Sequence, residues 1–125
     1  MDSNAKTLLV VDDDDVILTI AELGLKRAGF NVVRCNSGMA CLESLMYYTP
    51  DMILLDVEMP IMSGIQTLEI IKSNEEFKNI PVMFLTGSTD TGTVVAAKSL
   101  GAVGYVVKPF IPQELVDKVK AILKL

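Results

Sequence analysis

Short apolar runs alternate with helix-patterned segments along the whole chain, and this alternation restricts the fold more than any other feature. Four of the runs are rich in large aliphatic residues: Leu8-Leu9-Val10-Val11, Met52-Ile53-Leu54-Leu55, Val82-Met83-Phe84-Leu85 and Tyr105-Val106-Val107. Continuous apolar runs of this length are typical of strands that are buried on both faces. The alternation therefore predicts an α/β fold, with helices on both faces of a parallel sheet.

The expected elements cover nearly the whole chain. The expected strands lie at 6–12, at 31–35, at 51–56, in a run opened by Pro81, and at 103–107. The expected helices lie at 14–28, from Ser37 to a point before Pro50, at 64–73, at 91–100, and in a final segment with Pro112 near its first turn. Helix 14–28 carries Val16, Ile17, Ile20, Leu23 and Leu25 at helical spacing, and the second helix carries Met39, Leu42, Leu45 and Met46. Helix 91–100 is expected to be weak, because Gly92 and neighbouring β-branched residues lower its propensity.

Length and composition favour one compact domain over residues 1–125. Half of the residues are apolar and 22% are charged, which is typical of a globular chain. The net charge of −5 argues against direct nucleic-acid binding, because phosphate contacts need clustered Lys and Arg. No apolar stretch reaches the roughly 18 residues of a spanning helix, and no signal-peptide core is present, so we expect a cytoplasmic protein without membrane insertion. Cys35 and Cys41 are expected to be reduced thiols, since no His is present to complete a thiolate metal site.

Polar residues follow four of the apolar runs. Asp12, Asp13, Asp14 and Asp15 close the first run, and Asp56, Thr86 and Lys108 close the other three. The carboxyl ends of parallel strands share one edge of the sheet, so these groups are predicted to meet there. Crowded carboxylates repel one another unless a cation, a lysine or a helix N-terminus compensates their charge. An alternative for the four acids is a helix cap followed by solvated side chains.

Taken together and in this order, these motifs resemble the receiver domain of two-component response regulators, of the single-domain chemotaxis type. The resemblance covers essentially all 125 residues. It rests on Val10-Val11-Asp12-Asp13, Leu54-Leu55-Asp56-Val57-Glu58-Met59-Pro60 with Gly64, Phe84-Leu85-Thr86-Gly87, and Tyr105-Val106-Val107-Lys108-Pro109-Phe110. It implies a flavodoxin-like (βα)5 three-layer sandwich whose five-stranded parallel sheet has the order 2-1-3-4-5. It also implies a cis bond between Lys108 and Pro109.

The resemblance assigns a chemical role to each strand-end residue. Asp56 would accept a phosphoryl group, and Thr86 and Lys108 would contact phosphoryl oxygens. Mg²⁺ would be held by Asp12, Asp13, an Asp56 oxygen and the Glu58 carbonyl. Hard oxygen ligands of this kind suit Mg²⁺, which neutralises charge on two groups that otherwise repel each other. Asp14 and Asp15 have no such role and are better explained by the first turn of a helix.

The resemblance also implies a switch. Thr86 and Tyr105 would couple phosphorylation to a surface formed by residues 91–100, the fifth strand and the last helix. Glu58 and Ser88 lie two residues after Asp56 and Thr86, and they would set the lifetime of the phosphorylated state. The protein would then be a signalling switch that catalyses only its own phosphorylation and dephosphorylation.

The implied partners are proteins. A histidine kinase or a histidine phosphotransfer protein would dock near Ile17, Ile20 and residues 109–111, and a downstream protein would read the output surface. Regulators with a fused DNA-binding domain often carry an acidic pair where this chain has Val103 and Gly104. Docking onto a protein target or relaying phosphate is therefore expected, from a monomer that could dimerise on phosphorylation. The chain could also be a receiver cut from a longer regulator or hybrid kinase.

Two other classes stay open from the residues alone. Asp12 and Asp14 after an apolar strand also resemble the first motif of haloacid-dehalogenase-type phosphatases, with Thr86 and Lys108 as later motifs. That class needs a further acid at a later strand end, which Tyr105-Val106-Val107 does not offer. A degenerate receiver that only binds a partner is disfavoured, because all five site residues are present.

Overall fold

The computed structural model describes residues 2–87 and 91–125, which form five strands and five helices. In chain order these are β1 (Thr7–Val11), α1 (Asp15–Arg27), β2 (Asn31–Cys35), α2 (Gly38–Ser44), β3 (Met52–Asp56), α3 (Gly64–Ser73), β4 (Val82–Thr86), α4 (Thr91–Ser99), β5 (Gly104–Val107) and α5 (Pro112–Leu123). All strand pairs are parallel, and the sheet order is β2-β1-β3-β4-β5. The predicted fold class and strand order are confirmed.

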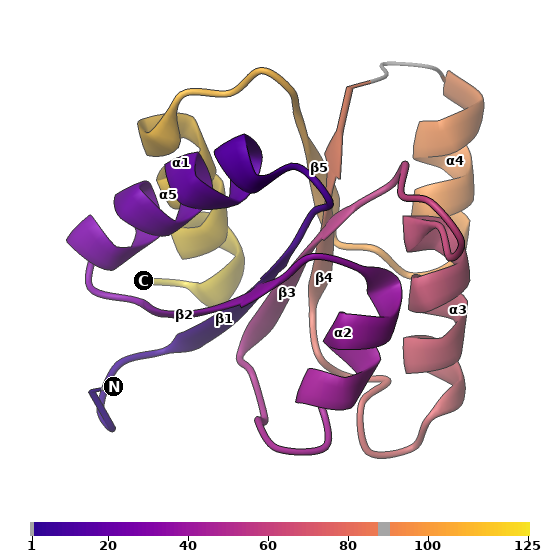
Figure 1. The fold of residues 1–125 in the computed structure, drawn as a ribbon, viewed down its shortest axis with the longest axis horizontal. Helices are drawn as coiled ribbons and strands as arrows, with labels where there is room; N and C mark the ends of the chain where they lie inside the picture. The colour runs from indigo at the N-terminus through magenta and orange to yellow at the C-terminus, as the bar shows by residue number, and fades with distance from the viewer. Residues whose placement is uncertain (1, 88–90) are drawn as a thin grey trace.

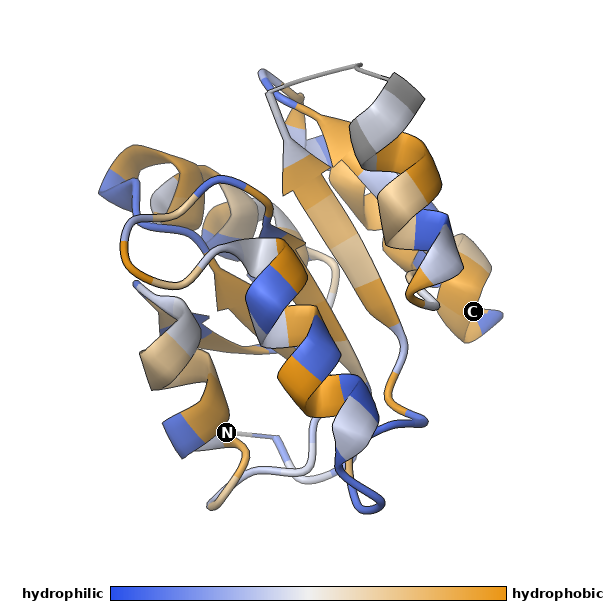
Figure 2. Cartoon of the chain, turned by 90° about the vertical axis from the view of Figure 1, so that its right-hand side faces the viewer, coloured by the Kyte–Doolittle hydropathy of each residue, from blue (hydrophilic) through white to orange (hydrophobic). Residues whose placement is uncertain are grey.

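Helices cover both faces of the sheet. Figure 1 shows α1 and α5 on one side and α2, α3 and α4 on the other. Alternate residues of each strand enter the two cores: Leu8 and Val10 of β1 pack with α1 and α5, whereas Leu9 and Val11 pack with the opposite helices. This follows from the two-residue period of a strand, and it explains why every strand residue near the centre is apolar. In Figure 2 the strands are predominantly hydrophobic, whereas the helices in front alternate hydrophobic and hydrophilic residues.

Local capping signals place the helix ends where the site is built. Asp14 is the N-cap of α1, Ser37 caps α2, and Ser63 forms a capping box with Gln66 at the start of α3. Gly29 ends α1 at a φ of 96°, a left-handed conformation that glycine adopts without steric cost. These caps fix the turns that follow β1 and β2 and the loop that follows β3.

Some apolar residues of the expected helices do not face the core. Val16 and Leu23 are exposed, because α1 is rotated so that Leu18, Ala21 and Leu25 pack against the sheet. In the second expected helix Leu45 is buried, but Met39 and Met46 are exposed. The helix ends at Ser44, earlier than its apolar spacing indicated, and the following residues form turns. No helix in the described ranges is both long enough and apolar enough to cross a membrane.

Candidate functional site

The four consecutive aspartates have separate roles. Asp12 extends the ladder of β1 through a 3.0 Å bond from its N–H to the Cys35 carbonyl, and its side chain is fully buried. Asp14 caps α1 by accepting a 2.9 Å bond from the Val16 N–H. Asp15 lies in the first turn, with its carboxylate 3.8 Å from the Arg34 guanidinium. The helix-cap interpretation is therefore correct for Asp14 and Asp15, whereas Asp12 and Asp13 lie with Asp56.

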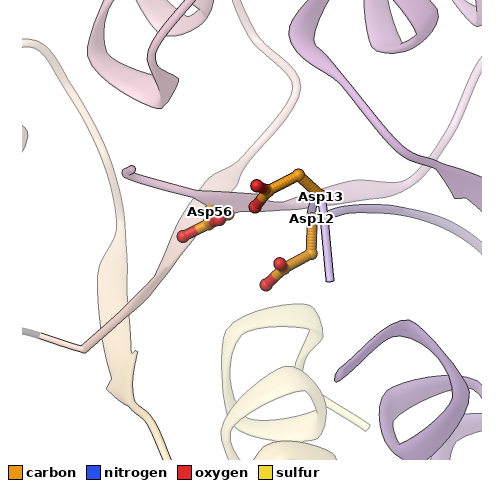
Figure 3. A group of neighbouring side chains, drawn as sticks. All are labelled: Asp12, Asp13 and Asp56. Atoms are coloured by element: carbon orange, nitrogen blue, oxygen red, sulfur yellow. The ribbon is translucent and has the colours of Figure 1, made fainter. Parts of the chain in front are cut away.

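Asp56 is the last residue of β3 and is only 3% exposed. One of its oxygens, Oδ1, accepts a 3.3 Å hydrogen bond from the Glu58 N–H. Figure 3 shows its carboxylate beside those of Asp12 and Asp13. Each of these three residues offers an oxygen within 4.8 Å of the other two. The three acids therefore lie together at the carboxyl ends of the strands, as the sequence predicted.

Lys108, directly after β5, brings a positive charge to these acids. Its ammonium lies 2.6 Å from Asp12 Oδ2 and 3.0 Å from Asp56 Oδ1. Its backbone N–H donates a 2.7 Å bond to the Thr86 carbonyl, and the bond to Pro109 is cis, as the resemblance implied. A single lysine thus links the ends of β1 and β3, and its backbone is held by the end of β4.

The buried carboxylates strongly affect one another's protonation. Burial raises the pKa of Asp56 to about 7; the hydrogen-bonded Lys108 ammonium opposes this effect, and the negative charge of Asp12 adds to it. Burial alone would lower the pKa of Lys108, but its bonds to Asp12 and Asp56 outweigh burial and raise it. The site therefore holds more negative charge than one ammonium neutralises.

The residues present fit a divalent cation. Asp12 Oδ2 is buried and has no hydrogen bond of good geometry among the described residues, although the Lys108 ammonium lies 2.6 Å away. This oxygen is paired with the Lys108 charge, but the ion pair uses only one of its lone pairs, so the other lone pair can bind a metal ion. Three carboxylates against one lysine leave a formal charge of −2, and hard oxygen donors are the ligands that Mg²⁺ prefers.

Of the remaining predicted residues, Thr86 and Glu58 lie at the carboxyl ends of the strands, whereas Tyr105 lies earlier, on β5. Thr86 ends β4 and is 2% exposed, and Glu58 is exposed in the loop after β3. Tyr105 is half-buried on the edge strand β5, where its carbonyl accepts a 2.9 Å bond from Lys118 of α5. The Lys118 ammonium also lies 5.4 Å from the centre of the Tyr105 ring. Ser88 lies outside the described residues.

The two cysteines lie away from these acids. Cys35 ends β2 and Cys41 lies on α2, and both are free thiols buried in the core between α2 and the sheet. Burial raises the pKa of Cys35, and it raises that of Cys41 to about 12, where the charge of Cys35 adds to the effect. Both thiols therefore stay protonated and act as small apolar side chains.

Two features of the loop after Asp56 became clear only in the structure, although the sequence carried a signal for one of them. Gly64 packs against the backbone of Asp56 and Val57 so closely that a β-carbon would overlap the Asp56 carbonyl. Ile61 adopts a φ of 69° and is fully exposed. The Gly64 motif pointed to the first feature, but a β-branched residue gives no signal for a positive φ.

The family follows from comparison with known proteins. The model of the response regulator receiver domain matches residues 8–120. The chain belongs to the response regulator receiver family. It is thus a receiver domain of the kind found in two-component regulators, and the predicted recognition is confirmed. Membership in this family replaces the dehalogenase-type alternative, whose acid Asp14 instead caps α1.

Curated relatives of this receiver are longer proteins. It is 36% identical to the DNA-binding response regulator MtrA of Mycolicibacterium smegmatis over 99% of its own length and 53% of the relative. It is 37% identical to the transcriptional regulatory protein PrrA of Mycobacterium tuberculosis over 94% of its own length and 49% of that relative. The chain therefore spans about half the length of the curated relatives it matches.

Solved receivers of similar length share the fold. The chemotaxis protein CheY4 of Vibrio cholerae superimposes with a TM-score of 0.90 at 29% identity, covering 94% of this chain and 98% of that one. A response regulator from Chloroflexus aurantiacus gives a TM-score of 0.91 at 37% identity, covering 98% of this chain and 100% of that one. The receiver thus resembles a chemotaxis protein in structure, and its sequence relatives include transcriptional regulators about twice its length.

Proposed function

We propose that Asp56 accepts a phosphoryl group from a phosphohistidine on a histidine kinase or a histidine phosphotransfer protein. The observation that carries this assignment is the position of Asp56, which is buried, 3.0 Å from the Lys108 ammonium and adjacent to two further carboxylates. Buried carboxylates beside other charged groups are typical of functional sites, because burying a charge is costly, and this supports the assignment.

In the transfer, an Asp56 carboxylate oxygen attacks phosphorus and forms the new P–O bond. The P–N bond to the donor histidine breaks, and its electron pair returns to the imidazole nitrogen. Lys108 releases Asp56 Oδ1 and pairs with a phosphoryl oxygen, while it keeps its contact with Asp12. The Thr86 hydroxyl donates to another phosphoryl oxygen. Because the lysine and the hydroxyl are positioned in advance, little reorganisation accompanies the reaction.

We infer that Asp12, Asp13, Asp56 and the Glu58 carbonyl hold Mg²⁺, which would neutralise charge between the acceptor and the incoming phosphoryl group. The acidic cluster and the unsatisfied capacity of Asp12 Oδ2 support this site. Without the metal ion, the raised pKa of Asp56 leaves part of the acceptor protonated near neutral pH even beside Lys108, and a protonated carboxyl is a poor nucleophile.

We propose that phosphorylation acts through Thr86 and Tyr105 on the surface formed by α4, β5 and α5, which a downstream protein then binds. The protein acts on no separate substrate in this scheme, so it is a switch and not an enzyme in the usual sense. Thr86 and Val107 are paired across β4 and β5, which places the proposed phosphate contact one strand away from Tyr105. Glu58 and Ser88 would set the lifetime of the phosphorylated state.

We further infer that residues 1–125 form one receiver unit that acts in the cytoplasm as a monomer, with dimerisation on phosphorylation as an option. Two buried cysteines that form no disulfide suit a reducing compartment. The net charge of −5 argues against DNA binding by this unit, so any DNA binding such as the name of MtrA indicates would come from chain outside a receiver.

Incubation with acetyl phosphate and Mg²⁺, followed by reduction and mass mapping of the acyl phosphate, tests this proposal. The expected result is one phosphoryl group on Asp56, lost in Asp56→Asn. Asp14→Asn is the matched control, because asparagine can keep the helix cap that Asp14 forms. Labelling on Asp12, or full labelling of Asp56→Asn at another carboxylate, would contradict the assignment.

A further inference from the structure

Ile61 has a backbone conformation that suits it poorly. Its φ is 69°, and the Met62 N–H donates a 2.8 Å hydrogen bond to the Pro60 carbonyl. A bond between residues two apart, with a positive φ at the residue between them, defines a strained γ-turn centred on Ile61. Isoleucine is branched at Cβ, so it tolerates this region worse than glycine or asparagine.

The side chain of Ile61 gains nothing inside the molecule to offset this strain. It is fully exposed, with a relative accessibility of 101%. An asparagine at this position would relieve the backbone and expose a polar group to water instead of a branched hydrocarbon. Folding stability therefore gives no reason for isoleucine at this position, and a contact outside the chain becomes the physical explanation.

The loop that carries Ile61 borders the acceptor. It begins directly after Asp56, where the Glu58 N–H bonds to the Asp56 carboxylate, and it is closed by a 2.8 Å bond from the Gly64 N–H to the Val57 carbonyl. Figure 1 shows this loop at the edge of the sheet where the strands end. Ile61 thus lies in the short loop next to the reacting carboxylate.

From these observations we propose that Ile61 is a contact residue for the phosphohistidine-bearing donor protein and helps to select that donor. This inference rests on the proposed function of Asp56. Because Asp56 is only 3% exposed, a protein donor can deliver its phosphoryl group only by covering the loops around it. Ile111, in the loop after β5 that carries Lys108, is also exposed, so a donor surface could cover apolar side chains from two of these loops.

The role is one of recognition and not of chemistry. Acetyl phosphate is small enough to reach Asp56 without touching Ile61, whereas a folded donor buries the side chain. Loss of a well-buried isoleucine at a protein interface slows transfer by about tenfold, as judged from the usual gain on burying such a side chain. Substitution of Ile61 is therefore expected to slow phosphoryl transfer from a protein donor and to leave labelling by a small donor nearly unchanged.

The test compares Ile61→Asn with the unsubstituted protein and with Ile70→Asn, which removes an exposed isoleucine from the body of α3. The protein donor is the autophosphorylated histidine kinase that labels the unsubstituted protein fastest in a panel of purified kinases. We expect Ile61→Asn to react with acetyl phosphate within about twofold of normal but with the kinase about tenfold more slowly. Its urea midpoint should rise, because strain is relieved. Ile70→Asn should react normally with both donors.

Equal transfer from the kinase to Ile61→Asn and to the unsubstituted protein would overturn the inference. A fall in the urea midpoint of Ile61→Asn would also overturn it, because it would mean that the side chain stabilises the chain itself. Failure of the proposed function is distinct, since the unsubstituted protein would then carry no label on Asp56 from acetyl phosphate.

Discussion

Gly64 packs so tightly against Asp56 that a β-carbon at position 64 would overlap the carbonyl oxygen of the acceptor residue. The Gly64 N–H also donates a 2.8 Å bond to the Val57 carbonyl, which closes the loop between β3 and α3. The first residue of α3 is therefore in contact with the last residue of β3. Backbone contact of this kind fixes the direction in which the Asp56 side chain leaves the strand.

Gly64→Ala is expected to lower both stability and phosphorylation. The new methyl group meets backbone atoms, which cannot move aside as a flexible side chain can, so we expect a loss on the order of 1–3 kcal/mol in the free energy of unfolding. Displacement of Asp56 should also slow labelling by acetyl phosphate. Urea denaturation and labelling rates measure the two effects.

The control for this substitution is Gly104→Ala. A β-carbon on Gly104 would have no described neighbour within 4 Å, and this glycine has no positive φ. Gly104→Ala should therefore leave both measurements nearly unchanged. Equal effects from the two substitutions would mean that the contact with Asp56 does not matter.

Asp56→Asn is expected to stabilise the metal-free protein at alkaline pH. Burial raises the pKa of Asp56 from 3.8 to about 7, so the folded state holds a proton that the unfolded state releases between these values. The stability linked to this proton is present below pH 4 and is lost as the pH rises through 7. Asparagine does not ionise, so its advantage should grow over that range to on the order of 1–3 kcal/mol.

Urea denaturation in EDTA at pH 5 and pH 8 checks this expectation. Mg²⁺ should reduce the difference at pH 8, because a bound cation favours the ionised carboxylate. A constant difference at both pH values would show that Asp56 ionises normally in the folded protein.

Asp13→Ala is expected to abolish Mg²⁺-dependent labelling without unfolding the protein. Asp13 is exposed and adds negative charge beside Asp12 and Asp56, so its removal should leave the metal-free stability unchanged or slightly higher. Labelling with and without Mg²⁺, together with the urea midpoint, measures both effects. Asp15→Ala is the control, because Asp15 lies 3.8 Å from Arg34 and has no part in the cluster. A large loss of metal-free stability in Asp13→Ala would instead make this acid structural.

The sequence predicted the fold well because each strand is a buried apolar run with a clear polar stop. The positions of Asp12, Asp56 and Lys108 followed from strand ends alone, since a parallel sheet gathers those ends at one edge. The same reasoning could not decide which of the four aspartates would join the site. That outcome depends on the α1 cap at Asp14 and on the distant partner Arg34, which is a tertiary contact.

Helix rotation and backbone conformation were harder to predict. Val16 and Leu23 have the same spacing as core residues, but the approach of α1 to α5 decides which stripe is buried. A β-carbon on Gly24 would overlap the Pro112 ring, so the close contact between α1 and α5 depends on this glycine. The spacing of apolar residues gives no sign of that dependence. The positive φ of Ile61 was equally hidden, because residue type predicts the opposite.

Glu58→Ala is expected to change the lifetime of the phosphoryl group but not the requirement for Asp56. The Glu58 N–H bonds to Asp56, and this backbone contact survives removal of the side chain. The exposed carboxylate lies two residues from the acceptor, where it can repel or orient an attacking water. Loss of label after removal of acetyl phosphate measures the half-life. Failure of Glu58→Ala to become labelled at all would mean that the side chain acts in the transfer itself.

Beryllofluoride, a mimic of the phosphoryl group, is expected to perturb amide resonances from residue 91 to residue 107. The Thr86 carbonyl accepts a 2.7 Å bond from the Lys108 N–H, so a displacement of Thr86 would also displace the backbone at the end of β5. Tyr105 lies on the same strand, where Lys118 of α5 contacts both its carbonyl and its ring, and a change there reaches α5. A ligand can shift such an element only if it binds one arrangement better than the other, and the mimic meets this condition by engaging Thr86 and Lys108.

Asp56→Asn should give no response, and Lys118→Met should alter the Tyr105 shift while keeping the binding of the mimic. Perturbations confined to the acid cluster, with residues 91–107 silent, would contradict the switch and favour a protein that only passes phosphate along a relay.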